Sequence, residues 1–193
     1  QDLTPVDNGL LAGSDAEIYV WEGTLGDGSI PPYEGENGIS WATTGLGWFG
    51  AGIMSIQPVN LYNFGDGFLK FRIKIPSNIA FQIGIIDVWG NQSYVEFPSG
   101  QTKYGLVRNG EWGQASIPIE DIRGPYIDLR MLSYEFVILE VNGAACEFAL
   151  DDIYWDGGGS VHIVDEDKNM ISNHYLLGDN YPNPFNPSTK FSY

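Results

Sequence analysis

Cysteine, histidine and positive charge are scarce in this sequence. Its 193 residues include one cysteine, Cys146, which cannot form an intramolecular disulfide or a cysteine-rich metal site. The two histidines, His162 and His174, lie in a polar C-terminal stretch, which argues against a catalytic triad or a multi-histidine zinc site. No apolar run approaches the roughly 20 residues that span a bilayer, so we expect no membrane insertion.

The charge balance excludes one class of partner. Nine lysine and arginine residues stand against 25 aspartate and glutamate residues, which gives a net charge of -16. Such a chain repels a phosphate backbone, so we expect no nucleic acid among its partners. The same charge argues against strongly anionic polysaccharides, whereas a neutral polymer is indifferent to it.

Short alternating runs fill the middle of the chain. From Phe68 to Ile75, apolar residues alternate with Lys70, Arg72 and Lys74, which predicts a strand with one buried and one solvated face. Similar runs between turn-forming residues predict strands at 17–21, 38–43, 52–57, 81–87, 92–97, 112–117, 127–131, 136–141 and 147–155. The fold class is therefore all-β: a two-sheet antiparallel β-sandwich with irregular N- and C-terminal tails.

Composition divides the chain into four segments. Residues 1–14 form an N-terminal tail, because proline, glycine, asparagine and serine interrupt every period there. The sandwich occupies residues 15–156. A glycine-rich hinge and an acidic linker follow at 157–177, and three closely spaced prolines within 178–193 exclude a helix there.

Two parts of the chain resemble known families. The segments SDAEIYVWEGTL, PPYEGENGISW, KYGLVRNGEWGQASIPIEDIRG and FALDDIYWD make residues 15–156 similar to the β-jelly-roll carbohydrate-binding modules of secreted bacterial polysaccharide-degrading enzymes. The likeness is strongest to a glucanase-associated module, related to families 4 and 11 and to galactose-binding-like domains. The tail LGDNYPNPFNPSTKFSY resembles the start of the C-terminal sorting domain of type IX secretion in Bacteroidetes-like bacteria. Together these resemblances imply a secreted or cell-surface protein with a sugar-binding jelly roll.

A sugar site in such a module combines an aromatic platform with planar polar groups. A large aromatic residue in a turn or a glycine-rich loop is hard to explain as core, and Asp128, Arg130 and Tyr134 share a parity that would place them on one face of a regular strand. The predicted carbohydrate-binding residues are Trp48, Asp87, Trp89, Tyr94, Arg130 and Tyr134. The alternative is that the aromatic residues among them fill the core, as we expect for Trp21, Trp41, Trp112 and Trp155.

The resemblance also implies a structural calcium ion, held between the first strand, the loop after it and the last strand. Calcium takes six to eight oxygen ligands, and a buried carboxylate without a partner is costly. The candidate ligands are Asp15, Glu17, Glu34, Glu36, Asp151 and Asp152. The alternative for the paired aspartates is that one faces solvent and the other caps a turn.

Two classes of function remain after these considerations. No nucleophile elbow, phosphate loop, HExxH or dinucleotide fingerprint occurs, so we do not expect an enzyme. We expect a non-catalytic secreted module that binds a β-glucan or a related polysaccharide. The alternative is a self-assembling extracellular structural protein, a surface fibre or coat, whose tails make contacts between subunits.

Overall fold

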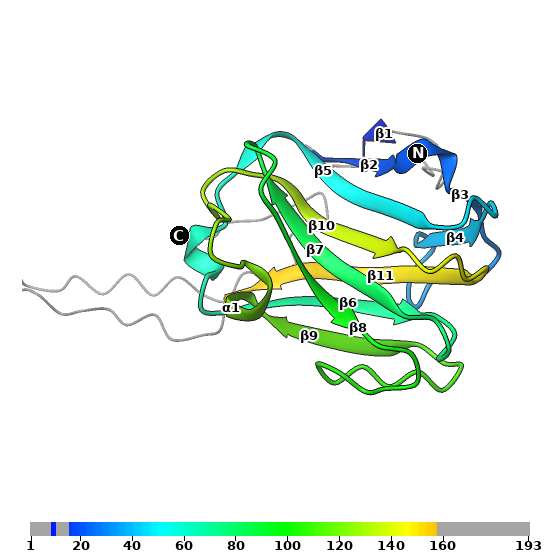
Figure 1. The fold of residues 1–193 in the computed structure, drawn as a ribbon. Helices are drawn as coiled ribbons and strands as arrows, with labels where there is room; N and C mark the ends of the chain where they lie inside the picture. The colour runs from blue at the N-terminus through cyan, green and yellow to red at the C-terminus, as the bar shows by residue number, and fades with distance from the viewer. Residues whose placement is uncertain (1–8, 11–15, 158–193) are drawn as a thin grey trace, which may run out of the picture. The chain divides into compact units, whose positions relative to one another are not determined.

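Alternation along the strands sorts side chains between one interior and two outer faces. In β6 (Phe68–Lys74) the side chains of Leu69, Phe71 and Ile73 are buried, while the lysine and arginine residues between them face outward. The computed structural model describes residues 9–10 and 16–157, and it packs such strands into two sheets that face each other (Figure 1). The buried apolar side chains of both sheets form one core.

Both sheets are antiparallel throughout the described residues. Sheet A has the strand order β1-β2-β5-β10-β7-β8, with the bounds β1 (Gly9–Leu10), β2 (Ala16–Val20), β5 (Phe49–Val59), β10 (Leu132–Glu140), β7 (Phe81–Asp87) and β8 (Gln92–Phe97). Sheet B has the order β3-β4-β11-β6-β9, with the bounds β3 (Leu25–Asp27), β4 (Ile39–Thr43), β11 (Glu147–Asp156) and β9 (Gly113–Pro118). The predicted antiparallel sandwich is confirmed.

Aromatic rings join the two sheets in the core. Phe71 of sheet B contacts Phe97 and Phe136 of sheet A, with ring centroids 6.1 Å and 5.4 Å away. Within sheet A, Phe81 of β7 stacks on Phe97 of β8 at 4.8 Å. Such pairs add about 0.5–1.5 kcal/mol each beyond the burial of their area, so they hold the sheets in register.

Three connections are tied together at one end of the sandwich, on the left of Figure 1. They are the segment 60–67 with η2 (Tyr62–Phe64), the β7–β8 turn at 88–91, and the segment 119–131 that begins with α1 (Ile119–Ile122). Backbone hydrogen bonds join them: the Leu61 amide to the Leu129 carbonyl at 2.7 Å, and the Val88 amide to the Met131 carbonyl at 3.0 Å. We call these segments the α1 end.

The structure corrects one predicted strand. Residues 127–131 form a turn, because the Asp128 carboxylate accepts the Arg130 amide at 2.9 Å and the Asp128 carbonyl accepts the Met131 amide at 3.0 Å. The prediction that Asp128, Arg130 and Tyr134 share one strand face is therefore wrong.

Some predictions fall on parts of the chain outside the described residues. These are Asp15, the segment 178–193, all of 157–177 except residue 157, and all of the N-terminal tail except Gly9–Leu10, which pairs with β2. Within the described residues, no helix is long and apolar enough to cross a membrane.

Candidate functional site

The outer face of sheet A carries aromatic rings laid over glycines. A Cβ atom added at Gly50 would lie 2.9 Å from the Trp48 ring, and one added at Gly52 would lie 2.8 Å from the Tyr134 ring. On β7, a Cβ atom at Gly84 would lie 2.2 Å from the Tyr94 ring. Glycine is required at these positions because the rings occupy the space that a side chain would need.

Two further rings extend this surface across β2 and η1 (Trp21–Gly23). Tyr19 faces outward, since its neighbours Ile18 and Val20 are buried, and its ring lies 5.8 Å from that of Trp21. Trp21 in turn lies 5.5 Å from Tyr134 with an interplanar angle of 32°. We define the aromatic face by its five rings: Tyr19, Trp21, Trp48, Tyr94 and Tyr134.

Polar groups accompany the rings. The Tyr94 hydroxyl donates to the Gln92 side-chain carbonyl at 2.8 Å. Burial raises the pKa of Tyr94, and burial together with the neighbouring Tyr19 raises the pKa of Tyr134, so both phenols stay protonated at neutral pH. A surface of this kind can pack against the apolar face of a pyranose ring and hydrogen-bond its hydroxyl groups.

The structure brings together three of the six predicted sugar-binding residues. Trp48, Tyr94 and Tyr134 lie on the aromatic face, whereas Trp89 and Arg130 belong to the α1 end, where they remain candidate ligand contacts. The sequence reasoning missed Tyr19 and assigned Trp21 to the core. Trp21 is half-buried on the aromatic face, which corrects that expectation.

Asp87, the sixth predicted residue, is buried at the end of β7 with only 1% of its surface exposed. One carboxylate oxygen accepts the amides of Trp89 and Asn91, each at 3.0 Å. The other accepts the Asn91 side-chain amide at 2.9 Å and the Asp128 amide at 3.4 Å. With four protein donors around it, Asp87 holds the β7–β8 turn and the segment after α1 in place.

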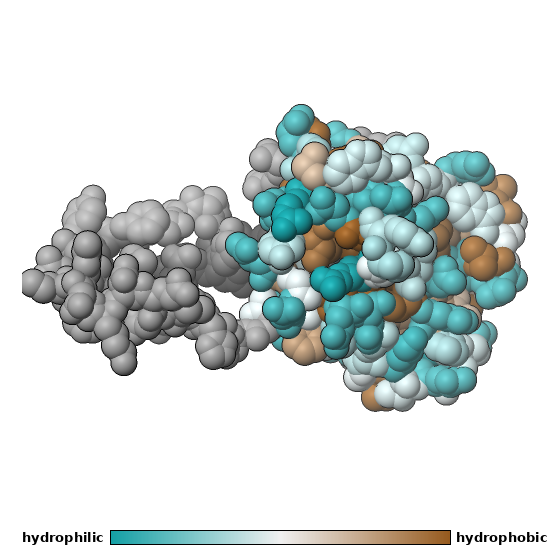
Figure 2. Space-filling view, turned by 60° about the vertical axis from the view of Figure 1, so that its left-hand side comes forward, coloured by the Kyte–Doolittle hydropathy of each residue, from teal (hydrophilic) through white to brown (hydrophobic). Residues whose placement is uncertain are grey.

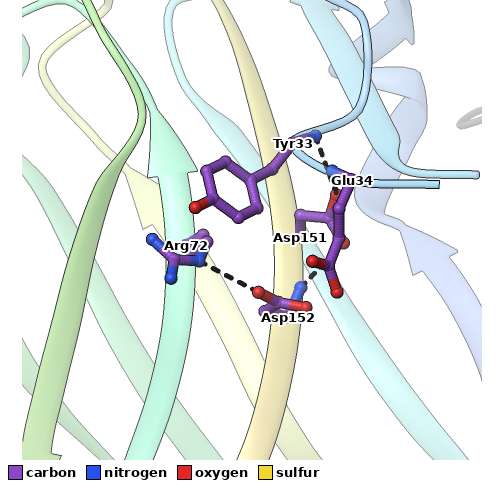
Figure 3. A network of polar contacts seen from close by, with 5 residues as sticks. All are labelled: Tyr33, Glu34, Arg72, Asp151 and Asp152. Carbon is purple, nitrogen blue, oxygen red and sulfur yellow. Dashed lines mark hydrogen bonds and ion pairs between the residues drawn. The ribbon is translucent and has the colours of Figure 1, made fainter.

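The paired aspartates of β11 lie on the outer face of sheet B. A break in register between Asp151 and Tyr154 and a φ of 48° at Asp152 mark a β-bulge, which turns both carboxylates toward the same side. Asp151 accepts the backbone amides of Tyr33 at 2.9 Å and Glu34 at 3.4 Å, and Asp152 pairs with Arg72 at 2.9 Å (Figure 3). Both carboxylates therefore have protein partners.

The other calcium candidates are spread over the molecule. Glu17 faces outward on β2 in sheet A, whereas Glu34 and Glu36 are exposed in the loop before β4 in sheet B. Among the residues that the structure describes, no three histidine, cysteine, aspartate or glutamate side chains come together as a metal site. The described carboxylates thus do not form a ready calcium site, and calcium binding stays a prediction.

Solved structures show the same fold. The family 30 carbohydrate-binding module of a cellulosomal cellulase of Clostridium thermocellum is 18% identical, with a TM-score of 0.56 over 72% of this chain and 90% of that one. The family 11 module of another cellulosomal cellulase of Clostridium thermocellum is 17% identical, with a TM-score of 0.54 over 84% and 96%. A further family 30 module is 16% identical, with a TM-score of 0.58 over 80% and 83%. At these identities the likeness establishes the fold alone.

The sequence itself gives the family. A comparison with curated proteins found no match. The family model described as carbohydrate binding domain 30 matches residues 11–157, which is most of the chain and nearly all of its described part. By that match, this chain belongs to the family 30 carbohydrate-binding domains.

Proposed function

We propose that the chain is a non-catalytic module that binds a β-glucan or a related neutral polysaccharide along the aromatic face. One observation carries the proposal: outward glycines on β5 and β7 let the rings of Trp48, Tyr94 and Tyr134 rest directly on the sheet. Rings seated in this way lose little freedom when a ligand packs on them, so more of the contact energy is available for binding.

Affinity electrophoresis in gels that contain barley β-glucan or hydroxyethylcellulose tests the proposal. We expect the protein to be retarded relative to a gel without polysaccharide, and Trp21→Ala and Tyr134→Ala each to abolish most of the retardation. Tyr154→Ala is a matched control, because Tyr154 is an exposed aromatic residue of β11 in sheet B. Full retardation of both aromatic-face variants, or none of the parent on any neutral glucan, would contradict the proposal.

The module is proposed to act outside the cell, as a secreted or cell-surface protein. Two of the similar structures come from cellulosomal cellulases, which supports an extracellular polysaccharide as partner. The tail YPNPFNPSTKFSY supports export through type IX secretion. Immunodetection in fractionated cultures of the source organism tests this proposal, and a signal confined to the cytoplasmic fraction would contradict it.

Structural calcium remains a separate proposal, supported by the resemblance to calcium-bearing jelly rolls. A bound ion stabilises the native state by mass action, so chelation with EDTA lowers the melting temperature and added calcium restores it. The measurement is differential scanning calorimetry of metal-free and calcium-loaded protein. Coincident melting curves would contradict calcium binding without affecting the sugar site.

A further inference from the structure

The α1 end contains a cavity that is separate from the aromatic face. Its volume is about 190 Å³, and Tyr62, Arg123, Asp128 and Arg130 contribute to its lining. Pockets for drug-sized ligands span about 300–1,000 Å³, so this cavity is suited to a single small unit such as one sugar ring.

Two of the seven lysine and arginine residues that the structure describes line this cavity, and the other five have partners elsewhere. Carboxylates pair with the three cations of β6: Lys70 with Asp156, Arg72 with Asp152 and Lys74 with Glu111. Backbone carbonyl groups accept from the other two: Glu96 from Lys103, and Ile79, Pro98 and Gln101 from Arg108. The two other cationic residues of the described chain, Arg123 and Arg130, both line this cavity, where Arg130 pairs with Asp128.

The residues that line the cavity carry a net positive charge in a strongly acidic protein. Asp128 is the one acidic residue of the lining, and its carboxylate lies 3.7 Å from Arg130. Burial raises the pKa of Tyr104 to about 12, and a hydrogen bond to Asp121 of α1 adds to this shift, so Asp121 faces Tyr104. The lining therefore combines two guanidinium groups with one carboxylate.

An aromatic ring fixes the orientation of one arginine. The Arg130 guanidinium lies 3.8 Å from the centroid of the Tyr62 ring, and Tyr62 is 52% exposed. A stacked guanidinium keeps the N–H groups of its edge available, and these match the two oxygens of a carboxylate. Trp89, which is 63% exposed on the turn held by Asp87, adds another open ring at the same end.

Figure 2 brings this side of the sandwich forward. Its surface is mostly hydrophilic, with hydrophobic residues visible between the hydrophilic ones.

From these observations we propose that the cavity at the α1 end binds one carboxylate-bearing sugar, a hexuronate residue, as a second site. Arg123 and Arg130 hold its carboxylate, the Asp128 carboxylate accepts a ring hydroxyl and Tyr62 packs beside it. A polysaccharide with occasional uronate branches or a uronate terminus thus reaches this site, whereas a continuous polyanion is repelled by the overall charge of -16.

The test is a titration of ¹⁵N-labelled full-length protein with methyl β-D-glucuronide, followed by NMR. We expect a millimolar dissociation constant, with shifted amides in residues 60–67 and 123–131. Methyl β-D-glucoside should bind at least about 10-fold more weakly, and added salt should weaken glucuronide binding because ion pairing contributes to it.

Variants separate the charge from the fold. Arg123→Gln and Arg130→Gln should each weaken glucuronide binding by about 10-fold or more. Arg130→Lys should also weaken it, because lysine keeps the charge but lacks the planar guanidinium that binds both oxygens of a carboxylate. Lys103→Gln, a loss of one positive charge away from the cavity, should leave binding unchanged. Each variant must keep the parental circular dichroism spectrum and two-dimensional NMR pattern outside the α1 end.

Three outcomes would overturn the assignment. Equal affinity for glucoside and glucuronide would remove the role of the carboxylate. Unchanged affinity in both arginine-to-glutamine variants would place the site elsewhere. Inorganic sulfate that binds as tightly as glucuronide, with the same shifted amides, would reduce the cavity to a simple anion site. Failure here is distinguishable from failure of the glucan site, because we expect Trp21→Ala to reduce only glucan retardation and Arg130→Gln to reduce only glucuronide binding.

Discussion

At the scale of single residues, the glycines beneath the aromatic rings are as informative as the rings. A Cβ atom at Gly52 would lie 2.8 Å from the Tyr134 ring, 3.1 Å from the Trp21 ring and 3.1 Å from the Phe136 carbonyl oxygen. Gly52→Ala should therefore lift both rings, cost about 1–3 kcal/mol of stability through overpacking and reduce affinity for β-glucan by about 10-fold. Affinity electrophoresis and chemical denaturation measure the two effects.

A second glycine supplies the control for this prediction. At Gly26 of β3, an added Cβ atom would meet its nearest neighbour, a Thr44 methyl carbon, at an ordinary 3.8 Å. Gly26→Ala should leave both stability and affinity nearly unchanged. If Gly52→Ala retained full affinity while its stability fell, the rings would not depend on the glycine as proposed.

The carboxyl group of Glu135 gives a prediction about pH. Burial raises its pKa, although a hydrogen bond from the Ser55 hydroxyl opposes the shift. The folded state thus favours the protonated acid, and this stabilising contribution is lost as the pH rises through the folded-state pKa. Glu135→Gln, which stays neutral, should melt at a higher temperature than the parent at pH 7, and the two should converge below about pH 4.

An exposed glutamate separates this effect from a general change of charge. Glu96 is exposed on β8, so Glu96→Gln should shift the melting temperature little at either pH. A constant difference between Glu135→Gln and the parent at all pH values would show that packing, not ionisation, is responsible.

At the scale of secondary structure, the sequence predicted strands wherever alternation was regular. β7 and β8 have the predicted bounds, and β6 ends one residue before the predicted limit. Buried and outward residues alternate strictly in β6, and the apolar residues of β7 and β8 recur at every second position over most of their length. The run at 127–131 failed because its apolar residues surround an Asp128 turn, which local hydrogen bonds form in place of a ladder. The spacing of apolar residues does not reveal that local hydrogen bonds compete with strand pairing.

The aromatic face was predictable only in part for a related reason. The glycine-rich loop around Trp48 and the parity of Tyr134 with Asp128 and Arg130 suggested these two residues, but their approach depends on the pairing of β5 with β10. Tyr19 joins them because β2 pairs with the other edge of β5, with Tyr19 opposite Gly52. No local pattern contains this register, so the sequence could not connect η1 and β2 with the site.

Asp87 shows how one buried carboxylate organises several connections. Four N–H groups donate to the two carboxylate oxygens of Asp87. Asp87→Asn replaces one of these oxygens with an NH₂ group, which cannot accept a hydrogen bond, so at least one donor loses its partner. We expect a loss of about 1–3 kcal/mol in the free energy of unfolding and faster amide exchange at 88–91 and 128–131. Asp66→Asn, at an exposed position, is the control. Parental stability in Asp87→Asn would contradict this structural role.

At the scale of the whole molecule, the two outer faces differ in kind. Sheet B presents ion pairs along β6, whereas sheet A presents rings and glycines. Surface ion pairs contribute little binding energy to a neutral ligand, because their charges satisfy one another. Binding of a neutral glucan to sheet A should accordingly be insensitive to salt, in contrast with the arginine-lined cavity at the α1 end.

The assembly state decides between the module and the alternative of a surface fibre or coat. The family assignment favours the module, and a binding domain of this kind needs no second copy to complete its aromatic face, since all five rings lie within residues 16–157. We therefore expect a monodisperse particle near 21.3 kDa in multi-angle light scattering, with no filaments in negative-stain images. The same result with added β-glucan oligosaccharide would show that ligand does not drive assembly. Filaments or large regular particles without sugar would instead move the functional contacts from the aromatic face to surfaces between subunits.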